Sequence, residues 1–277
     1  MLSYPDIDPV ALAIGPIKVH WYGVMYLAAF VGGWWLARVR ARDEWRGFAA
    51  RDADDLLFYI ACGVIAGGRL GYMIFYDFER LLGDPSAILR VWQGGMSFHG
   101  GLIGVLSAMA LYARKTDRTF FQVTDFIAPY AAPGLGLGRL GNFINGNLWG
   151  QPSDVPWAMV FPSPAAGDVA RHPTQLYEFA LEGVVLFAVI WLYSRRPRPV
   201  MAVSGLFLIA YALFRFSVEF LRVPDAHIGY LAFDWMTMGQ LLTLPMFIIG
   251  IVLMWLAHGR GRSVTTHAPK TGQPSGQ

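Results

Sequence analysis

Charged residues are scarce in this chain. Of its 277 residues only 15% are Asp, Glu, Lys or Arg, whereas a soluble domain carries roughly 25%. Hydrophobic residues make up 55% and aromatic residues 15%. These charges are too few to cover a water-exposed surface. The composition therefore excludes an ordinary soluble domain and indicates a membrane protein.

Cysteine is also scarce, because Cys62 is the only one in the sequence. A single cysteine excludes an internal disulfide, a CxxC redox pair and a zinc cluster built from cysteines. The net charge of +3 could suggest a nucleic-acid partner, but the basic residues form short clusters between apolar runs rather than one polar face. We therefore expect no nucleic-acid partner, no metal and no cofactor.

Seven apolar windows have the length of a bilayer-spanning helix, about 20 residues. They run approximately from Val19 to Ala37, Leu56 to Tyr76, Met96 to Ala113, Phe120 to Leu140, Gln175 to Ser194, Met201 to Glu219 and Met236 to Ala257. The pattern predicts an all-α polytopic membrane protein with about seven transmembrane helices. Residues 1–257 are expected to form a single transmembrane catalytic domain, and the polar tail 258–277 is expected to be disordered in the cytoplasm.

The distribution of Lys and Arg predicts the orientation of these helices, because cytoplasmic connections retain positive charge. Connections on one side carry 14 Lys and Arg, against five on the other side. The N-terminus is therefore placed outside the cytoplasm and the C-terminus inside. The long connection 141–174, rich in Pro and Gly, lies on the outer side, where long loops often carry function. We expect a periplasmic head region there.

Ionisable residues lie in or at the ends of these windows. Burying such a group in hydrocarbon costs several kcal/mol, so each one is a functional hypothesis that requires a partner. For Arg69 and Glu182, a role only in holding helices together is an equal alternative. The residues concerned are Arg69, His99, Arg139, Glu178, Glu182, Arg215 and Glu219.

The stretch from Gly134 to Gly150 is the most informative. Its glycines at 134, 138 and 141 predict a small-residue helix face that another helix or a lipid headgroup can approach closely. Arg139 and Asn142, three residues apart, share one helical face. A guanidinium beside the carboxamides of Asn142, Asn145 and Asn147 favours recognition of a phosphate ester. The alternative is a helix C-terminus whose arginine caps carbonyl groups.

Further candidates lie on other windows. Arg215 and Glu219 are four residues apart and can pair along one helix, so that Arg215 could clamp a phosphodiester together with Arg139. His99 can exchange a proton near neutral pH, and glycines on both sides of its motif leave space for a substrate. A satisfied helix-start residue is the alternative for His99, and an aromatic membrane anchor is the alternative for Tyr22.

The candidates cluster at the outer ends of their windows. A transporter would place polar groups near the midplane, in broken helices related by a repeat. The pattern therefore favours an enzyme that works at the outer leaflet. A phospholipid or anion transporter, which would use the same intramembrane charges, remains the alternative.

Five motifs resemble those of the bacterial phosphatidylglycerol prolipoprotein diacylglyceryl transferases. They are His20–Gly23, Ser97–Gly101, Gly138–Gly150, His172–Glu178 and Phe214–Arg222. The resemblance implies a multi-pass protein of the bacterial inner membrane with its active site toward the periplasm. Its partners would be phosphatidylglycerol and prolipoprotein signal peptides with a lipobox cysteine. The implied reaction joins the diacylglyceryl group to that cysteine as a thioether and releases glycerol phosphate, without a metal or cofactor.

The resemblance also bears on the site residues. Together with the reasoning above, it assigns catalytic roles to His99, Arg139 and Arg215. Substrate binding is assigned to Arg139 and to Tyr22, Asn142, Asn145, Gly150, Glu178 and Glu219. The family often has an acid at the position of Asn147, so no role of that acid is carried over to this chain.

Overall fold

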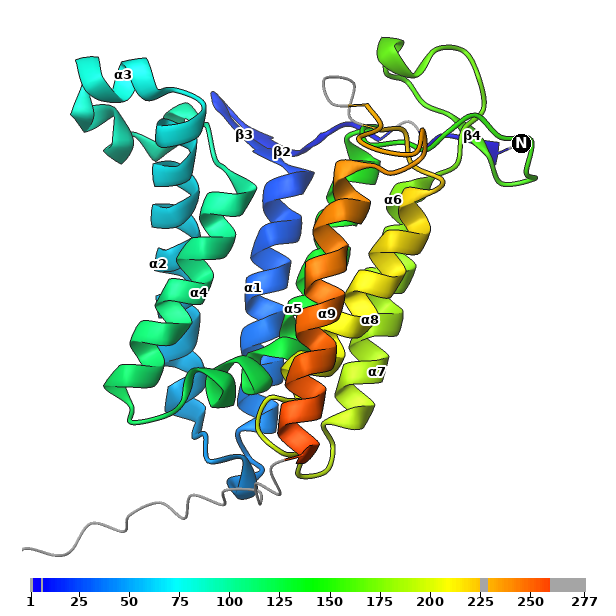
Figure 1. Ribbon diagram of the computed structural model, residues 1–277. Coiled ribbons are helices and arrows are strands. Elements are labelled where there is room, and N and C mark those ends of the chain that lie inside the picture. The colour runs from blue at the N-terminus through cyan, green and yellow to red at the C-terminus, as the bar shows by residue number, and fades with distance from the viewer. Residues whose placement is uncertain (1, 6, 225–228, 260–277) are drawn as a thin grey trace, which may run out of the picture. The chain divides into compact units, whose positions relative to one another are not determined.

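The computed structural model of the chain describes residues 2–5, 7–224 and 229–259. The chain divides into two compact units, one with its described residues in 2–36 and 127–259 and the other spanning 37–126 (Figure 1). Each unit is described by itself. The tail expected over 258–277 lies, from residue 260 onward, outside the described residues.

All seven apolar windows coincide with helices in the described part of the chain. The helices are α1 (Trp21–Arg40), α2 (Ala50–Phe75), α4 (Phe98–Lys115), α5 (Phe120–Ile144), the continuous run of α6 (Thr174–Glu178), η5 (Phe179–Val185) and α7 (Leu186–Tyr193), α8 (Ala202–Glu219) and α9 (Met238–Gly259).

Four of these helices are long and apolar enough to cross a membrane. They are α2, the run from α6 to α7, α8 and α9. In α1, α4 and α5, glycine, tryptophan, proline and terminal basic residues lower the mean hydropathy. The described chain is therefore a mostly helical membrane protein with four candidate spans.

Close glycine packing joins α2 to α4 in the unit 37–126. A Cβ atom on Gly104 would lie 2.0 Å from the carbonyl oxygen of Gly63, and one on Gly67 would lie 2.4 Å from that of Gly100. The two backbones therefore touch along a small-residue stripe, and Figure 1 shows the helices side by side. The glycine that follows His99 thus serves helix packing, rather than only clearing space for a substrate.

Arg69, on α2, is buried and 2% exposed. Its guanidinium donates hydrogen bonds to the backbone carbonyls of Ala87 at 2.6 Å, Ile88 at 3.3 Å and Gly95 at 3.2 Å, and to that of Gly94. Arg69 therefore holds the segment between α2 and α4. That segment contains α3 (Phe78–Gly83), η2 (Pro85–Leu89) and η3 (Val91–Gln93).

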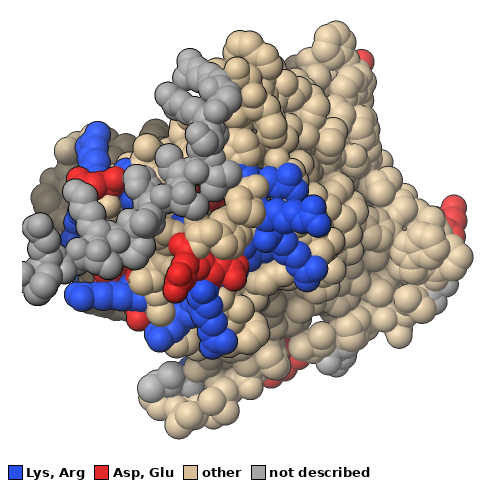
Figure 2. Space-filling model, turned by 90° about the horizontal axis from the view of Figure 1, so that it is seen from below, with Lys and Arg blue, Asp and Glu red and all other residues tan. Residues whose placement is uncertain are grey.

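Basic residues end several helices of this unit. Arg38 and Arg40 lie in the last turn of α1, which is followed by η1 (Glu44–Arg46), and α4 ends in Arg114 and Lys115. The guanidinium of Arg118 donates two hydrogen bonds of 3.0 Å to the carboxylate of Asp52. Figure 2, the view from the lower end of Figure 1, shows Lys and Arg side chains gathered there.

The other unit is built around α5, α7, α8 and α9. Its core consists of small and aliphatic side chains from three helices: Ala128, Ala132, Leu186, Ile190, Val203 and Ala210. Glycines again allow the closest approaches. A Cβ on Gly136 would lie 2.8 Å from the Cα of Gly183, and one on Gly205 would lie 3.0 Å from the carbonyl oxygen of Gly250. Figure 1 shows α8 and α9 side by side.

Short strands, which the all-α prediction omitted, lie in the N-terminal segment and in the connection 141–174 of this unit. β1 (Leu2–Ser3) pairs in parallel with β4 (Met159–Val160), and β2 (Val10–Ile14) pairs with the antiparallel β3 (Ile17–His20). The connection 141–174, which also contains η4 (Pro164–Ala166), has a small core of its own. This core comprises Phe143, Met159, Phe161 and Ala166, with Tyr4, Trp149 and Leu176 packed against it.

The glycine contacts predict a large effect of a single methyl group. Gly104→Ala places its Cβ against the backbone of Gly63, which cannot yield as a flexible side chain would. We expect a loss of about 1–3 kcal/mol of unfolding free energy, measured by thermal and denaturant unfolding in detergent. Gly83→Ala is the control, because nothing lies within 4 Å of its Cβ position. Equal unfolding midpoints for the two variants would contradict the packing described.

Candidate active site

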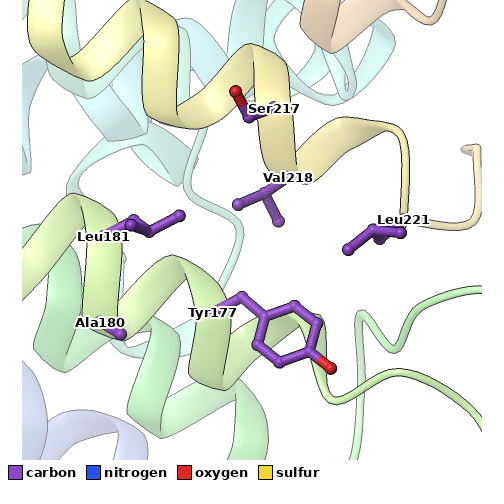
Figure 3. A pocket seen from close by; sticks show the side chains of 6 residues that line it. All are labelled: Tyr177, Ala180, Leu181, Ser217, Val218 and Leu221. Carbon is purple, nitrogen blue, oxygen red and sulfur yellow. The ribbon is translucent and has the colours of Figure 1, made fainter. Parts of the chain in front are cut away.

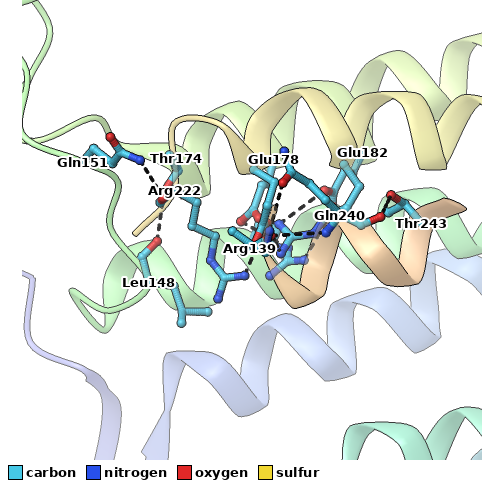
Figure 4. Close-up of polar contacts among 12 residues, drawn as sticks. Arg139, Leu148, Gln151, Thr174, Glu178, Glu182, Arg222, Gln240 and Thr243 are labelled. Carbon is cyan, nitrogen blue, oxygen red and sulfur yellow. Dashed lines mark hydrogen bonds and ion pairs between the residues drawn. The ribbon is translucent and has the colours of Figure 1, made fainter. Parts of the chain in front are cut away.

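Three arginines and three glutamates form one connected network in the unit 2–36 and 127–259. Its members are Arg139 on α5, Glu178 at the end of α6, Glu182 in η5, Arg215 and Glu219 on α8, and Arg222 just after α8. We call these six residues the arginine–glutamate network. Figure 4 shows side chains from separate helices pointing toward one another.

Arg139 and Arg215 converge on the same two carboxylates. Nε of Arg139 lies 3.4 Å from Oε2 of Glu178, and its Nη2 donates a hydrogen bond of 3.4 Å to Oε2 of Glu182. Nη1 of Arg215 donates to Oε1 of Glu178 and lies 3.9 Å from Oε1 of Glu182. The prediction that these arginines come together from separate helices is confirmed. Glu182, which the sequence left equally open to a structural role, lies at their meeting point.

The predicted pairing along α8 is also confirmed. Nη2 of Arg215 lies 2.7 Å from Oε2 of Glu219, and Nη1 of Arg222 lies 3.6 Å from the same oxygen. The hydroxyl of Thr237 donates a hydrogen bond of 2.9 Å to Oε1 of Glu219. Glu219 is therefore held by two arginines and by a residue from outside α8.

The start of α9 fits closely around Glu219. A Cβ on Gly239 would lie 2.7 Å from Oε1 of Glu219, so only glycine fits there without displacing the carboxylate. Thr237 and Gln240 form a reciprocal capping box, with bonds of 3.2 Å from the Gln240 N–H to the Thr237 hydroxyl and 3.0 Å from the Thr237 N–H to Oε1 of Gln240. Neither Thr237 nor Gly239 was predicted from the sequence. The pattern Thr-x-x-Gln before an apolar run is typical of a helix start and could have identified Thr237.

Burial distinguishes the arginines from one another. The side chains of Glu178 and Glu182 are fully buried, and that of Glu219 is 3% exposed. Arg139 is 19% exposed, against 8% for Arg215. Arg139 is thus the more accessible cation, whereas Arg215 is enclosed by carboxylates. Glu219, the predicted partner of Arg215, is one of these carboxylates, and Glu178 is a second.

Tyr22 lies against the glycine-rich part of α5. A Cβ on Gly141 would lie 2.8 Å from Cδ2 of Tyr22, so Gly141 makes room for this ring. The hydroxyls of Tyr22 and Tyr26 are 3.4 Å apart, and Tyr26 lies within electrostatic range of Arg139. At Gly138, beside Arg139, the space within 4 Å of a Cβ is open. The predicted approach of another helix is confirmed at Gly134 and Gly141, because a Cβ on Gly134 would lie 3.7 Å from the Cβ of Ala29, which like Tyr22 belongs to α1.

The loop that follows α5 is tied to the start of α6. Nε2 of Gln175 donates a hydrogen bond of 2.5 Å to the backbone carbonyl of Asn147. Asn142 is half-buried, whereas Asn145 and Asn147 are exposed. Gly150 is buried, its N–H donates a bond of 2.9 Å to the carbonyl of His172, and a Cβ there would lie 2.5 Å from the carbonyl oxygen of Leu221. A side chain at position 150 would therefore clash with the neighbouring backbone, which explains the glycine.

His99 belongs to the unit 37–126, not to the unit that holds the network. It is exposed in the first turn of α4, with its ring edge-on to Phe98 at 5.5 Å between centroids. Ser97 caps this helix, because its hydroxyl accepts a bond of 3.2 Å from the N–H of Gly100. The backbone N–H of Ser97 donates to the carbonyl of Gly68 at 2.9 Å. The start of α4 is therefore well anchored around His99.

An apolar pocket of about 320 Å³ lies between α6–η5 and α8. Figure 3 shows the six side chains that line it: Tyr177, Ala180, Leu181, Ser217, Val218 and Leu221. The Tyr177 hydroxyl accepts a bond of 2.6 Å from Nε1 of Trp157 and lies 3.1 Å from Nδ1 of His172. Burial lowers the pKa of His172, which favours its neutral form.

Removing one shared carboxylate should destabilise the unit that holds the network. Glu178→Gln leaves Arg139 and Arg215 with one negative charge fewer in a buried site, so we expect a loss of about 3–5 kcal/mol of unfolding free energy. Denaturant unfolding in detergent measures it. The control is Asp54→Asn, which breaks the exposed 2.9 Å pair with Arg38 and should cost at most about 1 kcal/mol. Equal losses would show that burial does not strengthen the network.

Comparison with known proteins identifies the family. The model of the prolipoprotein diacylglyceryl transferase family matches residues 9–256. A phosphatidylglycerol–prolipoprotein diacylglyceryl transferase of Azotobacter vinelandii is 60% identical over 94% of this chain and 98% of its own length. Proteins of the same name from Ectopseudomonas mendocina and Pseudomonas putida KT2440 are 57% and 56% identical, each over 94% of this chain and 97% of its own length. The chain therefore belongs to the prolipoprotein diacylglyceryl transferase family.

Proposed function

We propose that this chain is a transferase that moves the diacylglyceryl group of phosphatidylglycerol to the lipobox cysteine of a prolipoprotein. The reaction forms a thioether and releases glycerol phosphate, as the first step of bacterial lipoprotein maturation. The observation that carries the proposal is near full-length identity of 56–60% to proteins named for this activity. The buried network around a partly exposed Arg139 supports it.

We further propose that the protein crosses the bacterial inner membrane seven times with its active site toward the periplasm. The coincidence of all seven windows with helices supports the number of spans. The excess of Lys and Arg in connections on one side supports the orientation. In this topology residues 1–257 form one catalytic domain with a periplasmic head built on the connection 141–174. The tail 258–277 is cytoplasmic.

The chemistry balances without a nucleophile from this chain. The cysteine sulfur of the prolipoprotein attacks C3 of the glycerol backbone, forming a carbon–sulfur bond as the carbon–oxygen bond to phosphate breaks. The electron pair of the broken bond stays on the phosphate oxygen, and the thiol proton passes to a base. A free thiol has a pKa of about 8.5, so a base or a positive field must raise its thiolate fraction. His99 is the proposed base.

Arg139 is proposed to stabilise the charge that develops on the leaving phosphate. Its guanidinium is the more accessible of the two that converge on Glu178 and Glu182. Arg215 then acts mainly by fixing Glu178, and Glu219 acts by fixing Arg215. Each is thus a positioning residue for the cation that meets the lipid.

The remaining assignments concern the lipid. Asn142, one turn from Arg139, is proposed to orient the headgroup or an ester, and Tyr22 to bind the headgroup from its place against Gly141. Asn145 is exposed and can donate to phosphate, whereas Gly150 supports the loop. The apolar pocket beside Tyr177 offers space for hydrocarbon. The relatives are named as transferases, which favours transfer over transport.

Loss of the accessible cation should reduce transfer sharply. Arg139→Ala removes a charge-assisted contact worth at least about 2–3 kcal/mol, so the rate should fall roughly a hundredfold. Mass spectrometry of a lipobox peptide incubated with phosphatidylglycerol measures the product, and Arg38→Ala is the control for loss of an exposed arginine. A peptide with serine for cysteine should gain no lipid. Phosphatidylglycerol movement across liposomes without peptide modification would instead select the transporter.

His99→Gln tests the proposed base. A general base contributes about 10²–10⁴-fold, so transfer should fall by at least a hundredfold, and the rise of rate with pH near neutrality should flatten. His258→Gln, on the exposed last turn of α9, is the matched control. A rate and pH profile like those of the unaltered protein would remove His99 from the proton transfer and leave it a role in lipid positioning.

A further inference from the structure

The arginine–glutamate network carries no net charge when its residues are ionised. Three guanidiniums face three carboxylates, and the glutamates are at most 4% exposed. A phosphodiester brings one more negative charge into this buried site. An uncompensated buried charge is costly, and the usual response is that a nearby group changes its protonation state. Entry of the headgroup therefore requires that one carboxylate be neutralised or displaced.

The three carboxylates are not equally held. Oε1 of Glu178 accepts a hydrogen bond from Arg215, and its Oε2 lies 3.4 Å from Arg139. Glu219 has Arg215 at 2.7 Å and the Thr237 hydroxyl at 2.9 Å. Glu182 has the longest contacts of the three, a hydrogen bond from Arg139 at 3.4 Å and Arg215 at 3.9 Å. Each glutamate has one carboxylate oxygen that accepts no hydrogen bond from any described residue.

Glu182 is also the carboxylate to which Nη2 of the accessible Arg139 donates its hydrogen bond. The charged and titratable groups around it are Arg139 from α5, Arg215 and Tyr211 from α8, and Glu178 from its own helix. Two of these four are cations that already share Glu178. Neutralising Glu182 therefore leaves both arginines with a carboxylate partner, and it frees Nη2 of Arg139. That nitrogen is then available to donate to a phosphate oxygen.

We propose that binding of the anionic phosphodiester headgroup is coupled to the uptake of one proton by Glu182. Protonated Glu182 releases Arg139 toward the phosphate and keeps the occupied network neutral. Glu182 is thus a positioning residue that acts through Arg139. This inference rests on the proposed function for the identity of the lipid, but its test measures binding rather than transfer.

Isothermal titration calorimetry of the full-length protein in detergent tests the coupling. The probe is dihexanoyl phosphatidylglycerol near pH 7, where a phosphodiester does not titrate. Two buffers of different ionisation enthalpy report the number of protons taken up. We expect about one proton per bound lipid, with a dissociation constant that rises by up to about tenfold per pH unit above neutrality. Dihexanoyl phosphatidylcholine, which has no net charge, should cause no uptake.

Two variants identify the group that takes up the proton. Glu182→Gln imitates the protonated state, so it should bind the anionic lipid more tightly, with no proton uptake and a flat pH dependence. Asp54→Asn, which removes an exposed carboxylate outside the network, should keep both the uptake and the affinity of the unaltered protein. Binding of the lipid by the unaltered protein without proton uptake would overturn the inference, and that measurement needs no variant. Uptake that persists in Glu182→Gln would also overturn it.

Binding and transfer assays keep this inference separate from the proposed function. A glycerol phosphate arm, run in parallel, shows whether the free phosphate ester binds as the lipid does. If the unaltered protein takes up a proton on binding but never modifies a lipobox peptide, the proposed function fails and the coupling stands. If it modifies the peptide and binds lipid without proton uptake, the coupling alone fails.

Discussion

Pairing between buried arginines and glutamates is the interaction on which the arrangement of this site depends. A guanidinium or a carboxylate alone would be too costly at this depth in an apolar helix bundle. Arg139 and Arg215 lie on different helices and share Glu178 and Glu182 from a third. The network therefore fixes how α5, the run from α6 to η5, and α8 meet. The same pairing holds the accessible cation ready for a phosphate.

Glycine allows the helices to come close enough for this pairing. Gly136 on α5 touches Gly183, the residue after Glu182, and Gly239 at the start of α9 leaves room for the carboxylate of Glu219. Both positions bring backbone within contact distance of the network. In the other unit, α2 and α4 meet by the same means. Much of the glycine in this chain therefore serves packing, and Gly138 is the position beside Arg139 where the space stays open.

The sequence was sufficient to predict the helices and part of the ionic pairing between them. Apolar length located all seven helical segments, and a spacing of four residues predicted the pair formed by Arg215 and Glu219. It could not predict which arginine would be enclosed, because that depends on Glu178 and Glu182, which are far from Arg215 along the chain. Strands of two to five residues leave no periodic signal. Thr237 was missed because its capping pattern predicts a helix start but not the contact with Glu219 on another helix.

The short π-helix η5, Phe179–Val185, has a consequence for how the chain could change. A π turn contains one residue more than an α turn. The flanking helices α6 and α7 already have α geometry, so loss of one residue in η5 could be absorbed as a continuous α-helix. Glu182 lies inside this segment, so such a deletion would turn its side chain relative to Arg139. The direction of this one acid therefore depends on a local widening of the helix, whereas the helices on either side do not.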